Sequence, residues 1–296
     1  MAQPSDLLAW AIGNSDTSKL QKEATEVQPK KFEQKWIDAI FDNSSIKRMK
    51  ESLSMIVGSE CDTTHEEKVE GLQKMEYYIE DLDNAAELHK IGALLPIYEL
   101  AQVGNDEELQ FHALEVLATC MQDLPSAKKD VETNTEYLNS MISILNAPTS
   151  SDRVVRSCLR GIAAFTSHQK TKQVQFIKLG GWLALSKLAG HSSPRVRSRI
   201  YIQIGVLMQV LIAVPSVHPT WQNIREALIR ENDLEVLERA IAVLEQLKDI
   251  MKKGHPLLEQ SVLTQLAGNL QSLSLDGDTD QRDSLLQDLN ALLSQS

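Results

Sequence analysis

Aromatic residues, cysteine and strand-like alternation are all scarce in this sequence. Only 5% of its 296 residues are Phe, Trp or Tyr, and no stretch alternates convincingly between apolar and polar residues, so a β-sheet is not expected. The three cysteines form no CxxC pair, which argues against a disulfide framework or a zinc site and indicates a reducing compartment. The chain is therefore expected to be all-α.

The motifs of the common enzyme classes are also missing. The sequence contains no GxGxxG, Walker loop, HExxH or nucleophile elbow. A thiol–imidazole pair of Cys61 and His65 is conceivable, but the acidic neighbours Glu60 and Asp62 would raise the pKa of the thiol and weaken it as a nucleophile. We therefore expect no catalytic residue, no metal site and no cofactor.

Basic residues are outnumbered, with 30 Lys and Arg against 41 Asp and Glu and a formal net charge of −11. A field of this sign repels phosphates, which argues against binding to nucleic acid or to anionic membranes. The N-terminus lacks the basic region and long apolar run of a signal peptide, and the most apolar segment, 200–214, is shorter than the roughly 20 residues of a membrane crossing. We expect a cytoplasmic protein.

What the sequence has in abundance is one helical stripe, repeated four times. Apolar or small residues recur at steps of four, three, one and three residues, which is the spacing of one face of an α-helix. The stripes are Leu109, Ala113, Val116, Leu117 and Cys120; Val155, Leu159, Ile162, Ala163 and Thr166; Val196, Ile200, Gln203, Ile204 and Leu207; and Val236, Ala240, Val243, Leu244 and Leu247. The copies lie about 40 to 46 residues apart, the period of armadillo or HEAT units that bury their apolar faces by stacking. We predict an armadillo-like right-handed α-solenoid of about four repeats with helical caps, and with Cys120 and Cys158 in its core.

The segments around the stripes divide the chain into four parts. Residues 1–31 combine a short amphipathic helix with a polar, flexible linker, and that helix is either a frayed end or a device that touches a partner. Residues 32–82 are predicted to form N-terminal capping helices, and residues 83–254 the armadillo-like repeats. Residues 255–296 are predicted to form a C-terminal capping helix and an acidic, flexible tail with a loose final helix.

One flank of the striped helices has a basic character. The residues three positions past the start of each stripe are His112, Cys158, Arg199 and Arg239. Arg195 lies one turn before Arg199 and shares its flank. In armadillo stacks the last helix of each unit lines the concave wall, so this strip would suit an acidic protein surface. Alternatively, these arginines only solvate the face or pair with Glu235 and Glu238.

Four segments carry a resemblance to a known family, and the WAIGNSD and LDNAA pieces within them are not general armadillo features. The four segments are LLAWAIGNSD at 7–16, RMKESLSMI at 48–56, IEDLDNAAEL at 79–88, and QFIKLGGWLAL at 175–185, which PRVRSRI follows. With these segments the chain resembles the cytosolic armadillo-type nucleotide-exchange factors of the 70 kDa heat-shock protein, the family of the yeast Fes protein and its animal heat-shock-protein-binding homologue. The resemblance fades in the second unit and beyond Val214.

The resemblance implies a function and a set of contacts. In that family the concave face embraces lobe II of the chaperone's nucleotide-binding domain, distorts or displaces the other lobe and loosens ADP, which promotes substrate release. Two family contact positions correspond to Ala85, after the Asp-Asn joint, and to Arg199. A flexible N-terminal segment is thought to help expel substrate by posing as one, and the residues that would do so here are Leu7, Leu8, Trp10 and Ile12. The protein would then be a monomeric co-chaperone and not an enzyme.

The competing class is a general armadillo adaptor, for example a receptor for basic peptides. The grooves of such receptors use ladders of Trp and Asn on the concave helices. In this sequence Trp10, Trp36, Trp182 and Trp221 all lie outside the four striped helices. This placement favours the exchange factor over the adaptor.

Overall fold

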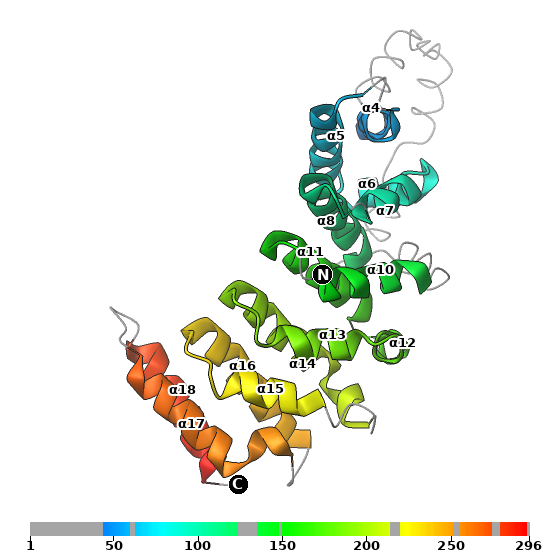
Figure 1. Ribbon diagram of the computed structural model, residues 1–296. Helices are drawn as coiled ribbons and strands as arrows, with labels where there is room; N and C mark the ends of the chain where they lie inside the picture. Colours follow the sequence, from blue (N-terminus) through cyan, green and yellow to red (C-terminus); the bar gives the residue numbers. More distant parts are fainter. Residues whose placement is uncertain are drawn as a thin grey trace, which may run out of the picture. The chain divides into compact units, whose positions relative to one another are not determined.

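The computed structural model describes residues 44–59, 63–102, 104–123, 135–147, 150–167, 169–213, 220–250, 255–273 and 279–294. Within these ranges every regular element is a helix, and there is no strand (Figure 1). The chain divides into two units, Met1–Lys47 and Arg48–Ser296. Only the last four residues of the first unit fall within the described ranges, so the architecture below is that of the second unit. The predicted all-α class is confirmed.

The longest helices of the second unit form one layer. In chain order they are α5 (His65–Tyr78), α8 (Glu107–Asp123), α11 (Asp152–Thr166), α14 (Pro194–Ala213), α16 (Leu234–Ile250) and α18 (Thr279–Leu293). Each packs against the next along the series, as Figure 1 shows. We call this the long-helix layer.

The other helices are mostly shorter and back the long ones. They are α4 (Ser45–Val57), α6 (Leu82–Lys90), α7 (Leu94–Ala101), α10 (Thr135–Asn146), α12 (Lys170–Lys178), α13 (Gly181–Leu188), α15 (Trp221–Leu228), the 3-10 turn η2 (Pro256–Leu258) and α17 (Gln260–Ser272). α7 packs on α8, α10 on α11 and α13, and α15 on α13 and α17. The result is the stacked, two-layer arrangement predicted from the repeat period.

The four predicted stripes form the core between these layers. Every stripe residue except Ala163 is buried. Two stripe members are polar, Thr166 and Gln203, and they bond to each other, with Gln203 Nε2 2.9 Å from Thr166 Oγ1. This bond joins α14 to α11 inside the core. It gives each of the two buried polar side chains a hydrogen-bond partner, as buried polar groups require.

Cys120 and Cys158 are buried in the core as predicted. Burial raises the pKa of the Cys120 thiol to about 12 and raises that of Cys158 further, because a thiolate is poorly solvated there. Cys158 Sγ donates a hydrogen bond to the Met141 carbonyl. Both thiols are therefore structural groups with little nucleophilic character.

A turn that needs glycine separates α12 from α13. Gly180 has a φ of +90°, a left-handed conformation that favours glycine. At the next position, a Cβ on Gly181 would lie 2.2 Å from the buried ring of Phe176. Gly92, which lies 88 residues earlier and so about two repeat periods before Gly180, has a φ of +73° before α7. The same chain reversal thus occurs two units apart.

The C-terminal region differs from the predicted loose final helix. α18 buries Leu285, Leu289 and Leu292 and packs against α16 and α17. Its apolar residues recur every three or four positions, so they form a stripe of their own. The stack therefore continues through α17 and α18 as a further helix pair.

One described helix, α14, is long and apolar enough to span a membrane by length and composition alone. Its apolar residues Ile200, Ile204 and Leu207 are buried completely. The helix packs against α11 on one side and α16 on the other. We therefore assign α14 to the core of the stack.

Candidate partner-binding surface

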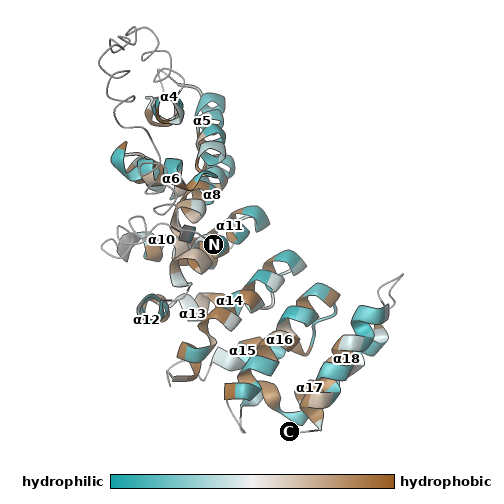
Figure 2. Ribbon diagram, turned by 180° about the vertical axis from the view of Figure 1, so that it is seen from behind, coloured by the Kyte–Doolittle hydropathy of each residue, from teal (hydrophilic) through white to brown (hydrophobic). Residues whose placement is uncertain are grey.

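Four equivalent positions follow one another across the exposed side of the long-helix layer. His112, Arg156, Arg199 and Arg239 each precede two consecutive buried residues, and each lies one turn after an exposed residue. They consequently occupy the same place on α8, α11, α14 and α16. We call these four residues, together with Arg195 one turn before Arg199, the basic row. In Figure 2 the first turns of α11, α14 and α16 are correspondingly hydrophilic.

On α11 the member of this row is Arg156. The residue three positions past the start of the stripe is Cys158, which is fully buried, as predicted, so Arg156 is the residue that reaches the surface. α11 packs against α8, α10, α12 and α14, so its buried face is wider than a single stripe. Counting from the first stripe residue therefore led to an interior position.

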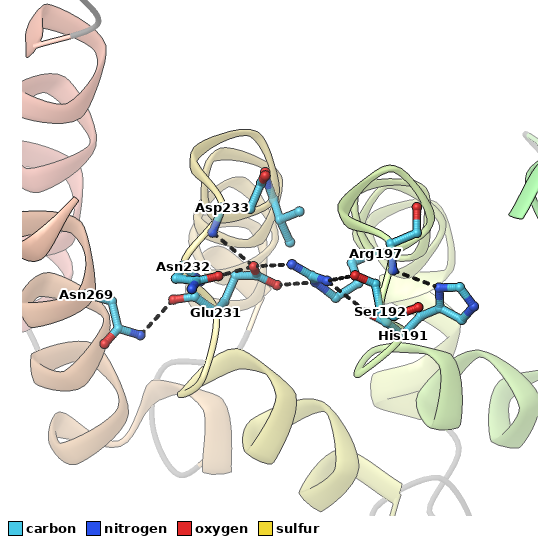
Figure 3. Close-up of polar contacts among 9 residues, drawn as sticks. His191, Ser192, Arg197, Glu231, Asn232, Asp233 and Asn269 are labelled. Atoms are coloured by element: carbon cyan, nitrogen blue, oxygen red, sulfur yellow. Dashed lines mark hydrogen bonds and ion pairs between the residues drawn. The ribbon is translucent and has the colours of Figure 1, made fainter. Parts of the chain in front are cut away.

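Arg197 belongs to the interior, although it stands between two members of the basic row. Its Nε and Nη2 atoms donate to the two carboxylate oxygens of Glu231 at 2.7 and 2.8 Å. Its Nη1 atom donates to the carbonyls of His191 and Ser192. Figure 3 shows Arg197 bridging the loop before α14 and the loop before α16 in this way. All its donor nitrogens are thus occupied within the fold.

Arg195 and Arg199, by contrast, are exposed, and no described side chain forms an ion pair with either. The alternative that the arginines are neutralised locally holds only for Arg239, which lies 3.7 Å from Glu238 in a solvent-exposed pair that contributes little. Glu235, the other suggested partner, accepts a hydrogen bond from Ser198 instead. Arg195 and Arg199 therefore keep their donors available to another molecule.

Both acidic and basic side chains surround Arg195 at the start of the basic row. A cavity of about 440 Å³ lies where α11, α14 and α16 begin, and its lining consists of Asp152, Arg156, Ser193, Pro194, Arg195, Asp233 and Glu235. Three carboxylates therefore lie near Arg195. Arg199, one turn further along α14, is outside this cavity and is the less compensated of the two cations.

His112 is largely committed within the fold. Its side chain is 12% exposed, with Nδ1 3.2 Å from Glu76 and Nε2 3.2 Å from Gln73. Both contacts tie α8 to α5. His112 thus continues the row in position, but its ring nitrogens are already engaged.

The described residues include no group of three or more His, Cys, Asp or Glu arranged to hold a metal ion. His65, the imidazole considered beside Cys61, lies 2.8 Å from Asp106, and Cys61 falls outside the described ranges. The most distinctive chemistry of the described surface is therefore its exposed guanidinium groups, which suit recognition of carboxylates.

One protein family and two known proteins are similar to this chain. Residues 5–88 match the family described as "Nucleotide exchange factor Fes1". The chain is 24% identical over 250 residues to the "Hsp70 nucleotide exchange factor FES1" of Saccharomyces cerevisiae, a match that covers 81% of this chain and 85% of that protein. The protein of the same name from Scheffersomyces stipitis is 25% identical over 189 residues, which are 62% of this chain and 64% of that protein.

Solved structures with a similar fold are armadillo repeat proteins. A designed armadillo repeat protein in complex with a (KR)4 peptide has a TM-score of 0.58 at 16% identity, over 83% of this chain and 99% of that one. A second, computationally designed for modular peptide recognition, has a TM-score of 0.56 at 16% identity, over 85% of this chain and 99% of that one. This likeness confirms the predicted armadillo-like fold of this chain.

The segment that matches the Fes1 family contains Ala85. Ala85 lies on α6 and is only 3% exposed, so its side chain packs in the core of the described structure, and its contact with a partner stays a prediction. Two hydrogen bonds hold the joint between α5 and α6. Asp81 caps α6 by accepting from the Asp83 amide, and Asn84 Nδ2 donates to the Tyr78 carbonyl at the end of α5. The large exposed side chains near this joint are Tyr77 and Leu82.

Some residues named in the sequence predictions fall outside the described residues. They are Leu7, Leu8, Trp10 and Ile12, which were assigned to substrate release, and Trp36. The remaining two tryptophans are Trp182 on α13 and Trp221 on α15. They are buried and stack on each other with ring centroids 4.7 Å apart. They lie outside the striped helices, as predicted, and they stabilise the core.

Proposed function

We propose that this protein is a co-chaperone that binds the nucleotide-binding domain of a cytosolic 70 kDa heat-shock protein and accelerates the release of ADP. The observation that carries the proposal is similarity to the Fes1 family, through the match of residues 5–88 and the 24% identity to a relative named as an Hsp70 nucleotide exchange factor. In this proposal the protein acts as a cytoplasmic monomer, forms and breaks no covalent bond, and so is not an enzyme.

The proposed contact surface is the basic row, with Arg199 at its centre and Arg195, Arg239 and His112 around it. Arg199 is exposed and lacks an ion-pair partner among the described residues, although the chain as a whole carries a charge of −11. A cation of this kind selects an acidic patch on its partner. We place lobe II of the nucleotide-binding domain against this row.

The mechanism follows from thermodynamic linkage. A factor that binds the nucleotide-free chaperone more tightly than the ADP form must weaken the binding of ADP by the same ratio. Coupling energies of this type are typically about 1 to 3 kcal/mol. The rigid stack of helices supplies a surface complementary to one chaperone conformation, and the population of chaperone shifts toward that conformation.

A second part of the proposal concerns residues 5–13. They belong to the segment that matches the Fes1 family, and their sequence predicts a short amphipathic helix with Leu7, Leu8, Ala11 and Ile12 on its apolar side. The large apolar residues proposed to act are Leu7, Leu8, Trp10 and Ile12. We assign these four residues to substrate release, in which they imitate an apolar substrate of the chaperone.

The adaptor for basic peptides is the weaker candidate. Its fold is supported by the likeness to designed peptide-binding armadillo proteins. However, Trp182 and Trp221 are buried and line no groove. Arg156, Arg195 and Arg199 would moreover repel a peptide rich in Lys and Arg.

The test is the dissociation of fluorescent ADP from a purified 70 kDa chaperone, followed by stopped-flow. We expect the protein to accelerate dissociation and Arg199→Glu to reduce that acceleration at least about tenfold, as loss of a charged interface contact does. The matched control is Arg230→Glu, the same charge change at an exposed position outside the basic row. Absence of acceleration by the wild type would refute the function. Equal activity of Arg199→Glu and the control would refute the surface.

A further inference from the structure

An exposed aliphatic pair continues the basic row along α14. Ile202 is 40% exposed and Val206 is 37% exposed. They follow Arg195 and Arg199 at helical steps of four, three and four residues, so all four side chains lie along one face of α14. The face is basic over its first two turns and aliphatic over the next two.

The neighbouring long helices have no such pair. The residues that correspond to Ile202 and Val206 are Glu115 and Thr119 on α8 and Ala242 and Gln246 on α16. Glu115 and Thr119 both bond to Arg160 of α11. Within the described part of these four helices, only α14 presents two large aliphatic side chains at this level.

The exposure of the pair does not come from loose packing of α14. Gly205 lies so close to α16 that a Cβ there would be 3.3 Å from Gln246 Oε1. The other side of α14 is buried completely at Ile200 and Ile204, so the helix is fully seated in the core. The exposure of Ile202 and Val206 therefore adds apolar surface in water without any gain in packing.

We propose that Ile202 and Val206 form the apolar centre of the partner contact, with Arg195 and Arg199 as its charged rim. The occupant is a folded protein surface that presents carboxylates beside an aliphatic patch. Charge complementarity selects this occupant, because two arginines without a partner in the described structure flank the pair in a chain of net charge −11. The proposal rests on the proposed function, in which that surface belongs to the nucleotide-binding domain of the chaperone.

The two halves of the face have different kinetic roles. An apolar centre that is fully desolvated in the complex holds the partner and sets the dissociation rate. Charges at the rim steer the encounter and set the association rate, with a strong dependence on salt. On this single helix, the aliphatic pair therefore sets the dissociation rate and the two arginines set the association rate.

The experiment measures both rates against the immobilised nucleotide-binding domain, at low and high salt. The aliphatic variant is Ile202→Ser with Val206→Ser. Its matched control is Leu95→Ser with Leu183→Ser, which changes two aliphatic residues on α7 and α13 that are exposed to a similar or greater degree. The rim variant is Arg195→Gln with Arg199→Gln. Far-UV circular dichroism verifies that all variants fold.

We expect the aliphatic variant to dissociate at least about tenfold faster, with an association rate within about twofold of the wild type. The rim variant should associate more slowly at low salt and lose most of its salt dependence. If the wild type accelerates ADP release while the aliphatic variant dissociates like the leucine control, the inference is overturned and the proposed function stands. If the wild type neither binds nor accelerates release, the proposed function itself fails.

Discussion

Two arginines of α14, Arg197 and Arg199, lie in opposite environments. We call the contact between Arg197 and the loop of Glu231 the loop edge. There Arg197 is 13% exposed and forms a bidentate ion pair with Glu231, which is 2% exposed. On the exposed face, Arg199 is surrounded by solvent. The difference arises because the two residues point in different directions from the same helix. The Arg197 side chain contacts a loop of the next repeat, and the Arg199 side chain points toward solvent.

This contrast separates the residues that hold the stack from the residues available to a partner. The Glu231 carboxylate raises the pKa of the Arg197 guanidinium and also accepts from the amides of Asn232 and Asp233. It therefore fixes the loop that begins α16 as well as the bridge to α14. Arg199 has no such duty, so a change there should affect binding and leave the fold unchanged.

The largest expected effect on folding is that of Glu231→Ala. The substitution leaves the Arg197 guanidinium mostly buried without its counter-ion and frees two amides. Loss of one partner of a buried pair costs about 3 to 5 kcal/mol, and we expect about 3 kcal/mol because Arg197 keeps two backbone carbonyls. Urea unfolding followed by circular dichroism measures this loss.

Arg199→Ala serves as the matched control for that measurement. It should change the free energy of unfolding by less than about 0.5 kcal/mol, as is usual for exposed sites. A similar loss for Glu231→Ala and Arg199→Ala would remove the distinction between the loop edge and the exposed face.

A smaller effect is expected for Asn269→Ala, which tests whether the loop edge extends to the next helix pair. Asn269 on α17 donates to the carbonyls of Ile229 and Glu231 at 3.1 and 2.8 Å. Its removal leaves two partly buried carbonyls short of a donor, at a cost of about 1 to 2 kcal/mol. The same urea unfolding detects the loss, and an unchanged midpoint would limit the edge to Arg197 and Glu231.

Ser198 lies between the two regions and should give a lesser effect. It is 3% exposed, and its hydroxyl donates to Glu235 on α16 at 3.0 Å. Because Glu235 is exposed and can bind water instead, Ser198→Ala should cost about 0.5 to 1 kcal/mol. Thermal unfolding of this variant, with Ser192→Ala as a control in the loop, checks the value. A loss as large as that of Glu231→Ala would show that our boundary between the regions is misplaced.

The sequence was sufficient for the elements that depend on local periodicity. The stripes of α8, α11, α14 and α16 predicted which residues are buried, because apolar residues that recur every 3.6 residues lie on one face of a helix, and that face is the buried one. The joint at Asp81 and Asn84 was also predictable, since short polar side chains favour helix starts.

The features that depend on contacts between distant segments were not predictable. Nothing in the sequence pairs Arg197 with Glu231, because the contact requires the actual approach of two loops. Because the buried face of α11 is wide, it includes Cys158, and Arg156 is the residue of α11 that lies in the basic row. Ala85 matched a family contact position, but α6 turns its side chain inward. Whether α18 docks was left open by the sequence, because its polar composition resembles that of a free tail.

The smallest predicted effect concerns a solvent-exposed counterpart of the Arg197 bridge, in which His65 at the start of α5 pairs with Asp106 before α8. The hydrogen bond to Asp106 raises the pKa of His65 above 6.5, and Glu66 and Glu108 add to the rise. Since the folded pKa is raised, the stabilisation is complete below the unfolded pKa and disappears as pH rises through the folded pKa. The stabilisation is small, because the pair is exposed to solvent.

Titration of the His65 ring protons by NMR should therefore give a midpoint above 6.5. Asp106→Asn should move that midpoint down, since it removes the negative charge. The asparagine can still cap α8, where Asp106 now accepts from the Leu109 amide, so the variant isolates the charge from the cap. A midpoint that is the same in both proteins would show that Asp106 does not hold the proton on His65. The pair would then be a contact of the cap alone, unlike the charged bridge at Arg197.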